Sequence, residues 1–111
     1  MNSSGENTKV VYWHRELPPL DAEPMQEHII EATSDRVPGT IERDGELWHR
    51  CHAALMENTR LRLLQEVTRL GGHYAHITDE HIEIKRDDAK GESWLDGRFN
   101  YMLYRRSGSS G

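Results

Sequence analysis

Cysteine is nearly missing from this chain of 111 residues, and Cys51 is the only one. A disulfide within the chain therefore cannot form, so packing and hydrogen bonds have to hold the fold. A lone cysteine is common in proteins of a reducing compartment. A hydrophobic leader is lacking as well, since residues 1–9 contain no apolar stretch. We therefore expect a cytoplasmic protein.

Long apolar runs and an excess of positive charge are also missing. No segment approaches the roughly 20 apolar residues that span a bilayer, so we expect no membrane partner. The chain has 14 Lys and Arg against 19 Asp and Glu, which gives a formal net charge of −5. Duplex nucleic acid is bound mainly through basic surface, so this balance argues against a nucleic-acid partner.

The remaining composition is sufficient for one ordinary domain. Hydrophobic residues make up 35% of the chain and charged residues 30%. We expect a single core within residues 9–106. The ends, residues 1–8 and 107–111, are rich in Gly, Ser and Asn and poor in apolar residues, and we expect both to be disordered.

Residues 45–70 are predicted to form one long helix. Asp44 precedes it as a candidate N-cap, whose carboxylate can accept hydrogen bonds from the first turn. Glu46 adds negative charge where the helix dipole favours it. Gly71 can adopt the left-handed conformation that ends a helix.

The apolar residues of this helix form two clusters on nearly opposite sides. The first half contributes Leu47, Trp48, Cys51, Ala54 and Leu55, and the second half contributes Met56, Leu63, Leu64, Val67 and Leu70. A surface helix needs only one apolar stripe. Two stripes predict a bend, a second protein layer or burial in an oligomer. Residues 58–62 contain no Pro or Gly to cause a bend, which favours the extra layer or the oligomer.

Alternating apolar and polar residues predict four strands, at residues 9–17, 27–34, 73–85 and 92–105. The first two are either a loosely connected hairpin or non-neighbours, because their connection is long enough for both. The third strand changes the parity of its apolar residues, which predicts a bulge near residues 78–80.

The last strand allows two registers. Asp96-Gly97 is a dipeptide that favours a hairpin turn. A turn at residues 86–91 followed by one long strand is the preferred alternative, with Gly97 at a bulge or a close approach. On this strand Leu95, Phe99, Tyr101 and Leu103 share one face.

These elements predict an α+β fold of order β-β-α-β-β. The sheet is expected to be four-stranded and largely antiparallel, with the long helix packed on one face. Its edges need covering, and edge-to-edge pairing between subunits is one way to cover them.

Two segments resemble the YbjQ-like family of small bacterial proteins, which is labelled as heavy-metal-binding. Residues 32–39 (ATSDRVPG) are similar to that family's Thr-rich strand ending in a Val-Pro-Gly turn. Residues 66–72 (EVTRLGG) are similar to its Glu-Ala-x-x-Leu-Gly-Ala exit from a helix into a strand, and Gly97 falls where the family has a Gly. The resemblance implies an α+β subunit in a ring-like homo-oligomer, and it assigns a metal to none of the residues here.

Seven histidines are the one compositional oddity. Histidine and cysteine are common zinc and copper ligands. On the helix, His49 and His52 have the i, i+3 spacing of converging ligands, but Cys51 is rotated away from both. His73 and His76 have opposite parity on a regular strand, and they lie at the other end of the helix. We therefore predict no metal site.

No catalytic constellation can be identified. Cys51 and His52 diverge by about 100° on a helix, so they are not a nucleophile and its base. The acidic pairs Asp79-Glu80 and Asp87-Asp88 fall in a bulge and a turn, where such residues serve backbone hydrogen bonds. Gly-rich phosphate-binding loops are missing. We therefore predict no catalytic residues and no cofactor.

The aromatic residues suggest a binding surface. Trp13 and Phe99 are predicted to be core. Tyr12, Trp94, Met102 and Tyr104 fall on the sheet face opposite the helix, where they either form a patch for a small apolar ligand or partner subunit, or only pack across strands. We predict a non-enzymatic protein that self-associates into a homo-oligomer. The alternatives are a metal-binding protein using histidines and a small enzyme with an aromatic-lined pocket.

Overall fold

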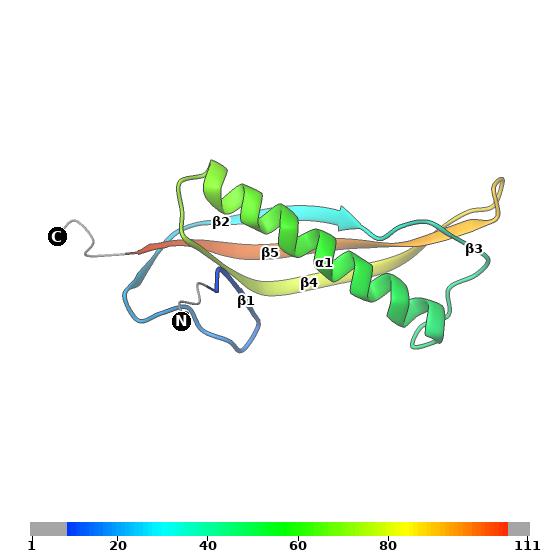
Figure 1. Ribbon diagram of the computed structural model, residues 1–111, viewed down its shortest axis with the longest axis horizontal. Helices are drawn as coiled ribbons and strands as arrows, with labels where there is room; N and C mark the ends of the chain where they lie inside the picture. The colour runs from blue at the N-terminus through cyan, green and yellow to red at the C-terminus, as the bar shows by residue number, and fades with distance from the viewer. Residues whose placement is uncertain (1–8, 107–111) are drawn as a thin grey trace, which may run out of the picture.

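One helix lies diagonally across one face of a twisted sheet in the computed structural model (Figure 1). The structure describes residues 9–106, so the ends predicted to be disordered, 1–8 and 107–111, lie outside the described residues. The elements in chain order are β1 (Val11–Trp13), β2 (Ala22–Thr33), β3 (Val37–Pro38), α1 (Glu46–Arg69), β4 (Tyr74–Asp87) and β5 (Glu92–Arg106).

The sheet is mixed and has five strands, so the prediction of an α+β fold with one helix on a four-stranded, largely antiparallel sheet is confirmed in part. Its order is β1-β4-β5-β2. The short β3 pairs with the first residues of β5, ahead of the segment of β5 that pairs with β2. The strands β2, β3 and β4 are antiparallel to β5. β1 runs parallel to β4 at one edge of the sheet. The chain then crosses to the opposite edge, where it forms β2.

The hairpin of the first two predicted strands is wrong, and their non-neighbouring arrangement is confirmed. β1 covers three residues instead of 9–17, because the chain leaves the sheet at His14, whose N–H donates to the Ile77 carbonyl at 2.8 Å. β2 begins at Ala22 instead of residue 27 and includes Pro24. An edge strand tolerates a proline, and the register of β2 shifts between Pro24 and Gln26.

The strand-pairing predictions for β4 and β5 are confirmed. The register shifts between Ile77 and Asp79, which places the bulge at Thr78. β5 is one long strand, and the turn lies between Asp87 and Glu92, so the hairpin at 96–97 is wrong. The four predicted core residues of β5, namely Leu95, Phe99, Tyr101 and Leu103, are all buried.

The two ends of α1 are built differently. Asp44 is not the N-cap. It adopts a left-handed conformation with φ 66°, in a turn where the Gly45 N–H donates to the Glu42 carbonyl, so Gly45 becomes the cap without a side-chain hydrogen bond. At the other end Gly71 has φ 79°, as predicted. The Gly71 and Gly72 N–H groups donate back into the last turn, in the Schellman arrangement.

The helix buries one continuous line of side chains, so its two apolar clusters do not by themselves require a bend, a second layer or another copy, and self-association stays a prediction. The buried residues recur at every fourth position, at Cys51, Leu55, Thr59, Leu63 and Val67. Each step of four residues turns the buried direction by about 40°, or about 160° over the whole line. A helix that crosses a twisted sheet diagonally follows such a line. Leu47 and Trp48 also pack against the same core.

Tyr101 carries a buried hydroxyl without a hydrogen-bond partner among residues 9–106, although its ring is fully enclosed. Burial is the main cause that raises its pKa above the ordinary 10.0. We expect Tyr101→Phe to raise the free energy of unfolding by about 1 kcal/mol, because it removes an unpaired polar atom.

The effect of Tyr101→Phe should grow with pH. The raised pKa in the folded state means that the wild type loses stability as pH rises above 10, because the unfolded chain releases the tyrosine proton first, whereas the Phe variant has no such proton to lose. Urea unfolding of both proteins near neutrality and above pH 10 measures the difference. A loss of stability in the variant would show that the hydroxyl has a partner.

Candidate functional site

The helical histidines serve aromatic packing. The His52 ring stacks on the Trp48 indole at 4.7 Å between centroids, and the His49 ring meets the indole edge-on at 5.3 Å. Cys51 is buried in the core, which agrees with its predicted rotation away from both histidines. Within residues 9–106 no group of three or more His, Cys, Asp or Glu side chains is placed to hold a metal ion.

Each of the strand histidines described next makes a polar contact of its own. The His73 Nδ1 atom accepts a hydrogen bond from the Arg106 N–H at 2.9 Å, which fixes its tautomer. The His76 Nε2 atom lies 2.7 Å from the His14 carbonyl oxygen. Sequence reasoning missed the contact of 2.8 Å between His14 Nε2 and Glu80 Oε1, because a parallel pairing of β1 with β4 was not foreseen.

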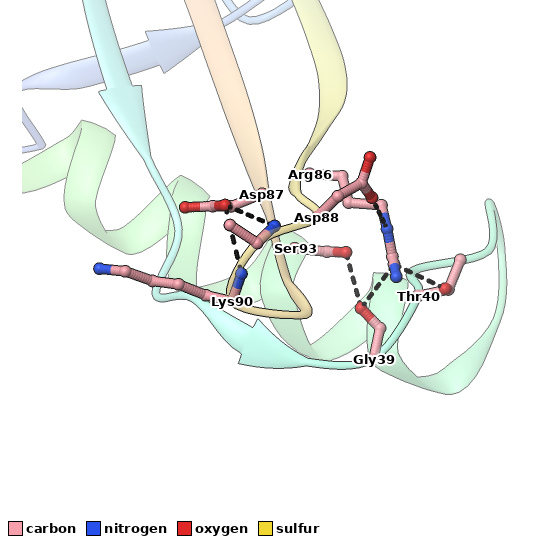
Figure 2. A network of polar contacts seen from close by, with 8 residues as sticks. Gly39, Thr40, Arg86, Asp87, Asp88, Lys90 and Ser93 are labelled. Carbon is pink, nitrogen blue, oxygen red and sulfur yellow. Dashed lines mark hydrogen bonds and ion pairs between the residues drawn. The ribbon is translucent and has the colours of Figure 1, made fainter.

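The acidic pair at the β4–β5 turn has the predicted structural role (Figure 2). Asp87 Oδ1 accepts hydrogen bonds from the N–H groups of Ala89 and Lys90 at 3.1 and 3.3 Å. Asp88 forms an ion pair of 2.6 Å with Arg86. Asp87 therefore stabilises the turn through backbone hydrogen bonds, whereas the ion pair of Asp88 is exposed to solvent.

The same turn is tied to the connection between β3 and α1 (Figure 2). The Arg86 guanidinium donates to Thr40 Oγ1 at 2.8 Å, and Ser93 Oγ donates to the Gly39 carbonyl at 2.7 Å. The Gly39 N–H in turn donates to the Gly91 carbonyl. This network holds two loops together, and no pattern in the sequence indicated it.

The sheet face opposite α1 is called the open face, and one half of it carries apolar side chains interspersed with polar ones, among them Glu27, His76 and Asn100. The strand registers place Met102 between His76 and Glu27, and Tyr104 beside Pro24. Ile29 of β2 lies opposite Asn100 on the same face and is 59% exposed. We define the apolar half of the open face by four residues, Tyr12, Ile29, Met102 and Tyr104.

The other half of the open face is charged. It contains a shallow hollow of about 300 Å³ lined by Glu31, His81, Glu83, Lys85, Asp96 and Arg98. Arg98 lies 3.5 Å from Glu31, and Lys85 lies 3.0 Å from Glu83. The pKa of Glu83 is lowered by hydrogen bonds from His81 and Lys85. Such exposed pairs, within β4 and between β5 and β2, are typical of a solvated surface.

Trp94 is separate from the predicted aromatic patch. It is eight positions from Met102 along β5, which corresponds to about 27 Å. The Arg36 guanidinium lies 4.0 Å from its ring centroid. The structure therefore brings together Tyr12, Met102 and Tyr104 at one end of the open face, and Trp94 lies at the other end.

The edge strand β2 is partly protected by side chains of α1. The Glu31 carbonyl accepts a hydrogen bond from Arg62 Nη1, and the Thr33 carbonyl accepts one from Asn58 Nδ2, both at 2.9 Å. Pro24 supplies no N–H to this edge. These features oppose pairing of β2 with another strand, so the open face is the better surface for contact between subunits.

A groove follows the seam between β1 and the second half of α1, and we call it the β1–α1 groove. It consists of two hollows of about 470 and 490 Å³ that share Lys9, Val10 and Leu64. The groove arises because α1 crosses toward β2 and leaves β1 less covered (Figure 1).

No family model matches the chain, and no curated protein or solved structure is similar to it. The resemblance to the YbjQ-like family therefore stays a prediction. Within residues 9–106 no helix is long and apolar enough to cross a membrane.

Proposed function

We propose that the protein is a non-enzymatic binding protein that self-associates through the apolar half of the open face. The observation that carries this proposal is the exposed Ile29, which lies diagonally across from Met102 on a sheet face that α1 does not cover. A sheet normally buries an apolar face against another layer. A second copy supplies that layer when the subunit has none of its own.

A contact that pairs the same surface of two copies satisfies this requirement. The two open faces would pack about 10 Å apart, with the apolar halves over each other and the charged halves at the rim. The protected edge of β2 supports face packing over edge pairing. A cytoplasmic location is compatible with this proposal, and the ring-like assembly that the YbjQ-like resemblance implies would need a second contact, because pairing of like surfaces closes as a dimer.

A binding role without catalysis is supported by how the titratable groups are used. The β4–β5 turn carboxylates accept hydrogen bonds from backbone N–H groups and from Arg86. His14 and Glu80 pair with each other on the surface. A nucleophile beside an oriented base is the arrangement that catalysis would need.

Sedimentation equilibrium tests the association. We expect the wild-type mass to be a multiple of the 12.9 kDa subunit at tens of micromolar. Ile29→Lys should weaken association by about tenfold or more, because it places a charge in the apolar contact.

Leu61→Lys is the matched control, because Leu61 is an exposed leucine (46%) on the opposite side of the molecule, on α1. This control variant should retain the wild-type mass. A wild-type protein that sediments as a monomer at this concentration would contradict the proposal. Equal weakening by Ile29→Lys and Leu61→Lys would place the contact elsewhere.

A further inference from the structure

The β1–α1 groove has an apolar floor. Val10 and Val11 line it from the β1 side, and Leu64 and Val67 line it from α1. Trp13 closes one end, with its ring edge-on to Phe99 at 6.3 Å. A concave apolar floor with a few polar groups at its margin is the usual form of a small-molecule site.

The charged side chains that line the groove are all cations. They are Lys9, Arg60 and Arg106, and no aspartate or glutamate is among the described residues that line either hollow. This is opposite to the chain as a whole, whose formal net charge is −5. The acids nearest to these cations lie outside the lining. Glu16 is 2.6 Å from Lys9, Glu57 is 2.8 Å from Arg60, and Asp21 interacts electrostatically with Arg106.

Two tyrosines contact two of the three cations, Lys9 and Arg106, which line the hollow of about 470 Å³, whereas Arg60 lines the other hollow. The Tyr12 and Tyr74 rings meet edge-to-face at 6.1 Å. Lys9 Nζ lies 5.2 Å from the Tyr12 ring centroid, and Arg106 Cζ lies 6.0 Å from the Tyr74 centroid. Arg106 Nε also donates to the Tyr74 hydroxyl at 3.4 Å. The hollow of about 470 Å³ therefore combines positive charge with hydroxyl groups.

We propose that the β1–α1 groove binds a small amphipathic carboxylate, of the medium-chain fatty-acid type. The apolar chain would lie on Val10 and Leu64 and reach toward Trp13. The carboxylate would lie between Lys9 and Arg106, where an anion replaces part of the pairing that Glu16 provides to Lys9. An uncharged apolar molecule would leave these cations without a new partner, so the charge complementarity favours the anion.

Titration of the full-length protein with decanoate, followed by calorimetry and tryptophan fluorescence, tests the proposal. We expect saturable binding with one decanoate per subunit. Leu64→Glu should reduce the affinity about tenfold or more, because it adds a repelling carboxylate to the floor. The double variant Lys9→Gln/Arg106→Gln should weaken decanoate binding and leave the binding of decanol unchanged.

Ile29→Lys separates this proposal from self-association. It should change the mass of the assembly without changing decanoate affinity. Circular dichroism establishes that Leu64→Glu is folded, and if it is not, the Lys9→Gln/Arg106→Gln variant decides.

Three results would overturn the proposal. The first is a decanoate Kd weaker than about 1 mM. The second is a decanol affinity equal to that of decanoate. The third is a folded Leu64→Glu protein that becomes monomeric, since the groove would then be covered by a second copy.

Discussion

Gly97→Ala is expected to lower the free energy of unfolding by about 2 kcal/mol, and Gly97→Val by more. A Cβ atom at this position would lie 2.7 Å from Phe99 Cε1 and 3.1 Å from Leu55 Cδ2. Both neighbouring side chains are fully buried, so neither can move into solvent to make room. The close approach of β5 to α1 at Gly97 therefore depends on the missing side chain. Urea denaturation measures the loss.

A double-mutant cycle identifies the cause of this effect. Phe99→Leu removes the ring atoms that the new Cβ would contact, so Gly97→Ala should cost less in that background than in the wild type. Equal costs of Gly97→Ala in the two backgrounds would contradict steric overlap with Phe99. The cost would then arise elsewhere, for example from the backbone of β5.

The second large effect is expected for the buried line of α1. Leu63→Ala should lower the free energy of unfolding by about 2–5 kcal/mol, because Leu63 is fully enclosed between α1 and the sheet. Leu61→Ala provides the matched control on the same turn of helix, since Leu61 is 46% exposed. We expect its cost to be within about 0.5 kcal/mol.

Leu64→Ala completes this comparison. Leu64 is partly buried and packs against the core from the groove side, so its cost should lie between those of Leu63 and Leu61. Chemical denaturation of the three variants under one set of conditions gives the order. Similar costs for Leu61 and Leu63 would contradict a single buried line and would support a helix covered on two sides.

The local elements could largely be predicted from the sequence. The bulge at Thr78, the glycine end of α1 and the alternating core of β5 each depend on residues close together in the chain. β1 and β3 were harder, because a strand of three residues and one of two have no recognisable periodicity. Their positions depend on distant partners, such as the pairing of Val37 with Ser93.

The buried line of α1 shows why helix periodicity was misleading. A straight helix on a flat surface repeats its buried side about every 3.6 residues, whereas this line repeats every four residues because the sheet twists. Thr59 lies in the middle of the line and is fully buried, with its hydroxyl donating to the Leu55 carbonyl at 2.7 Å. A search for apolar residues alone therefore divided one line into two clusters.

Only part of the two candidate surfaces, the open face and the β1–α1 groove, could be predicted from the sequence. Alternation along β5 correctly placed Met102 and Tyr104 on the open face, but it gave no warning that Trp94 lies at the far end of a long strand. The β1–α1 groove depends on the crossing angle of the helix. It also brings together Lys9 and Arg106 from opposite ends of the chain, which sequence spacing does not indicate.

The proposed assembly is tested most directly by NMR with a soluble paramagnetic agent, at a dilute and a concentrated protein sample. The amide signals of Ile29, Met102 and Tyr104 should become protected from the agent as concentration rises. Those of Glu57 and Leu61 on the outer side of α1 should stay accessible in both samples. Equal accessibility of Ile29, Met102 and Tyr104 at both concentrations, or protection that appears on α1 instead, would contradict association through the open face.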